Sequence, residues 1–125
     1  MDLEHGPGLK LIHDIAMGLV HQTKAQGESD FTLRQLSILL TVYLEQPPHT
    51  VRGLARKLGV TKPVITRALD AMGKQEIIAR RRDEADRRNV IIQRTVKGAL
   101  YVESLGDLIV EKAAHCLLYT SPSPR

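Results

Sequence analysis

Residues 50–95 read TVRGLARKLGVTKPVITRALDAMGKQEIIARRRDEADRRNVIIQRT, and they carry the signals that decide the fold. Thr50 and Thr61 each precede apolar residues at helical spacing, and threonine is a favoured N-cap residue. Gly59 is well placed to end the first helix. Pro63 falls in the first turn of the second helix, where a missing N–H costs little. The segment therefore predicts two short helices joined by a tight turn, the geometry of a helix-turn-helix.

The spacing of apolar residues changes after the second helix. The runs 77–81 (IIARR) and 90–94 (VIIQR) suit short strands, and the polar stretch 82–89 (RDEADRRN) has the length of a hairpin connection. The letters DEAD at 83–86 also occur in ATP-hydrolysing helicases. However, the chain has no glycine-rich loop ending in Gly-Lys-Ser/Thr, and 125 residues are too few for a two-lobed helicase. We therefore expect no enzyme, and ATP hydrolysis is only a distant alternative.

Helical periodicity also flanks this segment. We expect a loose, flexible N-terminus over residues 1–8 and a helix over 9–26 that ends at a glycine. Thr32 stands three residues before Gln35, the pattern of a capping box, and a further helix should follow. A last helix is expected over 95–114. The apolar side of the helix after Thr32 is expected to comprise Leu33, Leu36, Leu39, Leu40 and Tyr43.

The composition, 42% hydrophobic and 26% charged, is typical of a globular domain. The net charge of +4 and the pI of about 9.5 favour an anionic partner. No apolar run is long enough for a bilayer, and the start MDLEHGPGLK lacks the layout of a secretory signal, so we expect a cytoplasmic protein with no membrane partner. His13 and His21 could share a face of the first helix, with His5 nearby, but Cys or carboxylate partners at ligand spacing are missing, so we expect no metal site and no cofactor.

The last ten residues, 116–125 (CLLYTSPSPR), abruptly replace a helical pattern. They can be back-translated to one reading frame of a transposase-type adapter used in sequencing libraries. We therefore expect them to be an adapter-derived tail and the native domain to occupy residues 9–115. Without Arg125 the net charge falls from +4 to +3, so the basic character does not depend on the tail.

The order of these elements resembles the winged helix-turn-helix domain of the MarR family of bacterial transcription regulators. The matching stretch, about 50–95, has Thr66-Arg67 in the second turn of the recognition helix, Asp70 three residues later, and Asp86-Arg87-Arg88 in the wing. The expected fold class is mainly α with a small two-stranded β wing. One departure is Glu76, which stands where the family usually has glycine, so a left-handed backbone there would carry strain.

The exposed face of the second helix is expected to read double-stranded DNA. Lys62, Thr66 and Arg67 are spaced to enter the major groove, and Pro63 could contact thymine methyl groups. The backbone amides that follow Thr61 can bind a phosphate.

The wing is expected to supply further cationic contacts. Arg88 is the better candidate for the minor groove, beside Arg87 at the hairpin tip and Arg82 in the strand. The resemblance implies that Asp86 orients the wing arginine, and Asp83 is positioned to pair with Arg87. Each of Arg80, Arg81 and Arg82 could contact a phosphate, or could equally be a solvated charge at the edge of the strand.

The resemblance also implies a homodimer that binds a two-fold operator, usually as a repressor. Its interface would be formed by the terminal helices, through Leu9, Ile12, Leu105, Leu108 and Ile109. A small aromatic effector would bind between the dimerisation and winged parts and change the spacing of the two recognition helices. The alternative is a winged helix that serves protein–protein contact and binds DNA weakly and without sequence preference.

Overall fold

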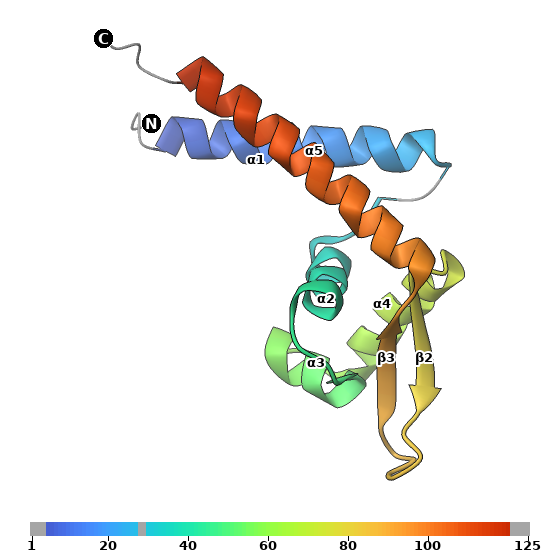
Figure 1. Cartoon of the computed structure of the whole chain (residues 1–125). Helices are drawn as coiled ribbons and strands as arrows, with labels where there is room; N and C mark the ends of the chain where they lie inside the picture. The colour runs from blue at the N-terminus through green and yellow to red at the C-terminus, as the bar shows by residue number, and fades with distance from the viewer. Residues whose placement is uncertain (1–4, 28–29, 121–125) are drawn as a thin grey trace. The chain divides into compact units, whose positions relative to one another are not determined.

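The computed structural model describes residues 5–27 and 30–120, and side chains as far as His115. It divides into two compact units, residues 31–102 and residues 1–30 with 103–125, which are described separately. The elements, labelled in Figure 1, are α1 (His5–Ala25), α2 (Leu33–Leu44), β1 (His49–Thr50), α3 (Val51–Leu58), α4 (Lys62–Lys74), β2 (Ile78–Arg82), β3 (Val90–Arg94) and α5 (Val96–Thr120).

The winged unit contains α2, α3, α4, the three strands and the start of α5. Thr32 closes the expected capping box with Gln35, through bonds of 3.0 Å in both directions. Leu33 is 81% exposed, contrary to the expected apolar side of α2. Leu39 is buried as expected, together with Ile38 and Val42, which were not expected on the apolar side. The core of the unit comprises Ile38, Leu39, Val42, Leu54, Ala55, Ile65, Ala68, Leu69, Met72, Ile77, Ile78, Ile92 and Tyr101.

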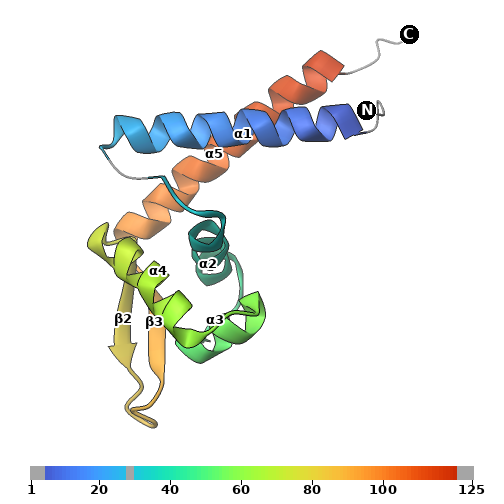
Figure 2. The same ribbon diagram turned by 180° about the vertical axis from the view of Figure 1, so that it is seen from behind.

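The sheet has three antiparallel strands in the order β1-β3-β2, and not two as expected. The additional strand, His49–Thr50, pairs with Ile92 and Ile91 and is too short to produce a pattern in the sequence. β2 and β3 form the expected hairpin, with Ile78 opposite Arg94 and Arg82 opposite Val90. In Figure 2 this hairpin extends past α3 and α4, so its tip is free of the helical core.

The second unit pairs α1 with α5 from residue 103 onward. Gly18 permits close packing, because a Cβ there would lie 2.8 Å from Cδ1 of Leu108. Gln22 also donates to Ser104 Oγ at 2.8 Å. α1 begins at His5, so residues 5–8 are helical and not loose. Pro7 lies in the first turn, where its missing N–H has no intrahelical partner to lose. Residues 1–4 lie outside the described part.

Candidate nucleic-acid interface

Local signals place α3 and α4 as a helix-turn-helix. The Thr50 side chain accepts from Gly53 N at 2.9 Å, which caps α3. Gly59 ends the helix with φ +69°, and Val60 N then donates to Ala55 O at 3.0 Å, satisfying a carbonyl of the last turn. Thr61 occupies the N-cap of α4, but its side chain makes no capping bond. The turn is therefore determined mainly by the first cap and the glycine.

The two faces of α4 differ in polarity as the sequence predicts. Ile65, Ala68, Leu69 and Met72 are buried in the core. The opposite face exposes Lys62, Pro63, Thr66 and Arg67. Helical side chains three and four residues apart are neighbours, so this face presents one continuous polar strip backed by a rigid core. Such a strip can donate to base edges and to phosphates.

The base of the hairpin is anchored to α2 by one tyrosine. The Tyr43 hydroxyl donates to Ile77 O at 2.6 Å, just before β2, and accepts from Thr95 N at 3.0 Å, just after β3. Glu76 adopts φ +62°, a left-handed conformation that carries strain in a residue other than glycine, and its carbonyl accepts from Thr95 Oγ1 at 2.8 Å. These bonds hold the two ends of the hairpin at one point, so the direction of the wing is set from its base.

The hairpin tip presents Arg88. Its side chain is 83% exposed, with Nε 3.1 Å from Asp86 Oδ1 and Nη2 3.3 Å from Oδ2. Arg88 N also lies 3.1 Å from Asp86 Oδ1. This paired geometry holds the guanidinium in one direction. The side-chain and backbone hydrogen bonds from Arg88 lower the pKa of the Asp86 carboxyl, and the Arg52 charge lowers it further.

The Arg52 effect identifies a residue that the sequence analysis missed. Arg52 is exposed in the first turn of α3, and its charge reaches the Asp86 carboxyl of the wing tip. It therefore adds positive potential on the side of the unit where the wing projects. The spacing of apolar residues does not predict this position, because it depends on how α3 packs against the hairpin.

Two expected ion pairs of the site do not form, and each of the two aspartates has a different partner. Asp83 was expected to pair with Arg87, but its Oδ1 accepts from Ala85 N at 2.9 Å and shapes the loop. No ion pair joins it to Arg87 among the described residues. Helical spacing alone favours Arg67 or Lys74, on the same helix, as the ion partner of Asp70. It binds Arg80 instead, at 2.8 Å, because β2 lies against α4 and supplies a closer cation.

The three consecutive arginines of β2 have different surroundings. Arg80 is held by Asp70, and Arg82 donates to Arg87 O at 3.0 Å. Arg82 is thus tied to the hairpin loop, near the other wing cations. Arg81 faces the opposite side of the sheet from Arg80 and Arg82, because strand neighbours alternate. Its guanidinium donates to Arg82 O over a long distance of 3.4 Å.

The residues expected at a dimer interface fall into two groups. Leu9 and Ile12 of α1 are 56% and 68% exposed in the single chain, so both could contact a second copy. Leu105 is only 2% exposed in the single chain, so it is a core residue and offers little surface to a partner. Leu108 and Ile109 are half-buried. Further exposed apolar side chains, Met17, Val20 and Val110, were not anticipated.

Over residues 5–27 and 30–120, no group of three or more histidine, cysteine or carboxylate side chains could hold a metal ion. No helix in the same ranges is long and apolar enough to cross a membrane.

Comparison with known proteins finds one matching family and several similar structures. Residues 31–90 match the family model described as MarR family. The structure is similar to a mutant of MepR from S. aureus, with TM-score 0.75, 21% identity, and coverage of 96% of this chain and 83% of that chain. It is also similar to YusO from Bacillus subtilis, with TM-score 0.70, 22% identity, and coverage of 87% and 74%.

A third similar structure contains nucleic acid. It is the S. aureus MepR–DNA complex, with TM-score 0.67, 24% identity, and coverage of 80% of this chain and 77% of that chain. At these identities the likeness establishes the fold. A comparison with curated protein sequences finds no match.

Proposed function

Because residues 31–90 make this chain a member of the MarR family, whose members are DNA-binding transcription regulators and not enzymes, we propose that it reads a specific operator as a homodimer and represses transcription. α4 would enter the major groove, and the Arg88 guanidinium would enter an adjacent minor groove.

The observation that carries the proposal is the pairing of two features in one unit. α4 presents Lys62, Thr66 and Arg67 on an exposed face, while its other face is locked into the core. The wing holds Arg88 in a fixed direction through Asp86. A surface that served only to keep the protein soluble would not need an oriented guanidinium, because solvated arginines gain little from fixed geometry.

The exposed apolar residues of α1 support the homodimer. Leu9, Ile12, Met17 and Val20 are between 43% and 68% exposed, and large apolar side chains grouped on one element are typical of an interaction surface. A two-fold dimer would present two copies of α4 to half-sites about one helical turn apart. We further propose that a small effector releases DNA by changing the spacing of the two recognition helices.

Selection from a random duplex pool at near-physiological salt tests this function. We expect an enriched two-fold motif, since phosphate contacts alone give binding that fades as salt rises. On that motif, Arg67→Ala and Arg88→Ala should each weaken binding by about 1–3 kcal/mol. Arg34→Ala is the matched control, because it removes an exposed arginine outside the proposed interface. If both interface variants behave like the control, the unit is a protein–protein interaction module instead.

A further inference from the structure

Arg94, the last residue of β3, links the base of the wing to the C-terminus of α2. Its Nε donates to Val42 O at 2.7 Å, and its Nη2 donates to Glu45 O at 3.0 Å. The last carbonyls of an α-helix lack intrahelical partners and carry partial negative charge, so a guanidinium suits both of them. The same guanidinium lies 5.9 Å from the centroid of the Tyr43 ring. None of the DNA contacts proposed above uses this arginine.

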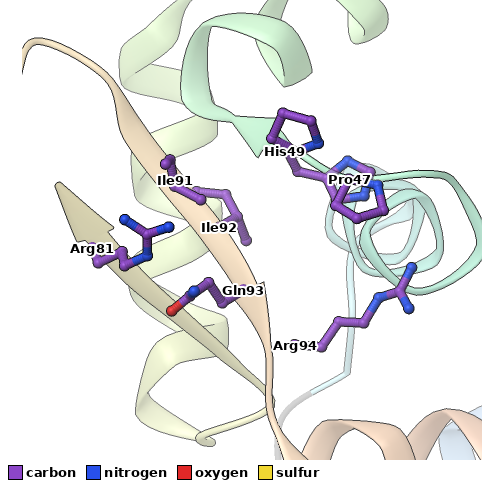
Figure 3. Close-up of a pocket in the computed structure, with 8 residues that line it drawn as sticks. Pro47, His49, Arg81, Ile91, Ile92, Gln93 and Arg94 are labelled. Carbon is purple, nitrogen blue, oxygen red and sulfur yellow. The ribbon is translucent and has the colours of Figure 1, made fainter. Parts of the chain in front are cut away.

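The strand ladder on the side of β1 ends before it reaches Arg94. β1 supplies two residues, which stand opposite Ile91 and Ile92. The same register would place Pro47 opposite Arg94, but proline has no N–H with which to extend a ladder. A hollow lies there, and its lining includes Pro47, Pro48, Arg81, Ile91, Gln93 and Arg94 (Figure 3). The Arg94 side chain extends to the side of β3 where Pro47 lies, so it joins this end of β3 to α2 in place of further strand pairing.

Arg94 and Tyr43 together give the wing a direction. The Tyr43 hydroxyl binds Ile77 O and Thr95 N, at the two ends of the hairpin. One point of attachment would leave a hairpin free to swing, whereas a second attachment beside it removes that freedom. α2 in turn packs against α4 in the core of the unit. The angle between the wing and the recognition helix is therefore transmitted through α2.

A small tilt at the base of the wing would displace its tip by a distance that matters for DNA binding. β3 rises about 3.3 Å per residue, so the tip lies about 15–20 Å from Arg94. A tilt of about 10° would then move Arg88 by about 3 Å, which is half the width of a minor groove of about 6 Å. The guanidinium of Arg88 would meet the wall of the groove instead of its floor.

We infer that Arg94 is a positioning residue for DNA binding, which fixes the angle between the wing and α4 without contacting DNA itself. Its forked guanidinium matters more than its charge, because two different nitrogens hold two different carbonyls. Without these bonds the wing swings, and Arg88 loses its fixed reach to the minor groove. The effect on DNA rests on the proposed function, whereas the orientation of the wing is a property of the free chain.

Residual dipolar couplings of the backbone amides, measured on the full chain without DNA, test the orientation. In the native chain the couplings of β2, β3 and α4 should fit one common alignment. Arg94→Met should reduce the couplings of the two strands and leave those of α4 unchanged; Arg94 is exposed, so this change opens no buried cavity. Arg34→Met, which removes an exposed arginine of α2 away from the hairpin base, is the matched control and should change neither set. Native strand couplings in Arg94→Met would overturn the inference.

A double-mutant cycle on the operator motif obtained by selection tests the consequence for DNA. Arg94→Met should weaken binding about tenfold in the native chain and in Arg67→Ala. In Arg88→Ala it should weaken binding only about twofold or less, because a wing without its arginine gains little from its orientation. A direct phosphate contact or a general loss of stability would weaken all three backgrounds equally, and that result would overturn the inference.

Arg94→Lys separates geometry from charge, because lysine keeps the charge and loses the fork. We expect it to bind the operator as weakly as Arg94→Met, and full affinity in Arg94→Lys would overturn the inference. Circular dichroism at the assay temperature checks that each variant is folded. If Arg67→Ala and Arg88→Ala both bind like the native chain, the proposed function fails and the effect on DNA fails with it. The dipolar couplings would still decide whether Arg94 orients the wing.

Discussion

Replacement of Gly98 by alanine should destabilise the winged unit, although alanine is the better helix former. Gly98 lies in the first turns of α5 and is buried. A Cβ at this position would overlap the Tyr43 hydroxyl and the Ile77 carbonyl oxygen. The carbonyl belongs to the backbone just before β2, so both the tyrosine and this backbone must shift to make room for the Cβ. That movement would break the anchor at the base of the hairpin.

Three contributions determine the change in the free energy of unfolding. Alanine gains about 1 kcal/mol over glycine inside a helix. Displacing Tyr43 loses its bonds to Ile77 O and Thr95 N, at about 1 kcal/mol each. Forcing an extra methyl group into a packed site costs about 1–3 kcal/mol more. The net loss of unfolding free energy should therefore be about 2–4 kcal/mol.

Urea denaturation followed by circular dichroism measures this loss. Gly106→Ala is the matched control, since Gly106 lies on the same helix. Apart from its chain neighbours and its own helix backbone, no described heavy atom lies within 4 Å of the added Cβ. It should gain about 0.5–1 kcal/mol. A Gly98→Ala variant as stable as the native chain would refute the reasoning. Equal destabilisation by both variants would show that the cause is a general effect on α5 and not the contact with Tyr43.

Three further predictions concern the wing and the surface of α1. Glu76→Gly should raise the unfolding free energy by about 1 kcal/mol, because glycine adopts φ +62° without strain; no gain in urea denaturation would contradict this. The Asp86 carboxyl should titrate below its ordinary pKa of 3.8 by carbon NMR, and Arg88→Ala should return its pKa toward that value. Since the pKa of Asp86 is lower in the folded state, the Asp86–Arg88 contact contributes fully to stability above pH 3.8. This contribution is lost as the pH falls through the folded-state pKa. An unchanged Asp86 pKa in Arg88→Ala would refute the assignment. Ile12→Glu should convert the proposed dimer to monomer in analytical ultracentrifugation, whereas Leu44→Glu, at an equally exposed leucine of α2, should not; a dimer that survives the first change would exclude this face.

Much of the winged fold was predictable because its signals are local. Thr32 with Gln35, Thr50 with Gly53, and Gly59 each act within a few residues, and all lie where the sequence places them. The buried stripe of α4 follows from apolar spacing alone. At Glu76 the sequence indicated only that a left-handed backbone would carry strain, and the structure has that conformation, with φ +62°.

Long-range partners could not be read in this way. Asp70 was assigned a neighbour on its own helix, but β2 brings Arg80 to 2.8 Å. Leu105 has the same apolar pattern as an interface residue, and only packing shows that it is buried. Helical spacing identifies which side chains share a face, but it does not identify what covers that face.

Sequence by itself determined the helix-turn-helix, the wing hairpin and the exposed strip of α4, because caps, glycines and apolar periods act over one or two turns. Tertiary structure alone decided that β1 adds a third strand, that Tyr43 joins both ends of the hairpin, and that Arg81 faces a hollow while Arg80 is held by Asp70. Each of these depends on contacts between residues distant in the chain, and such contacts form only when packing brings the elements together.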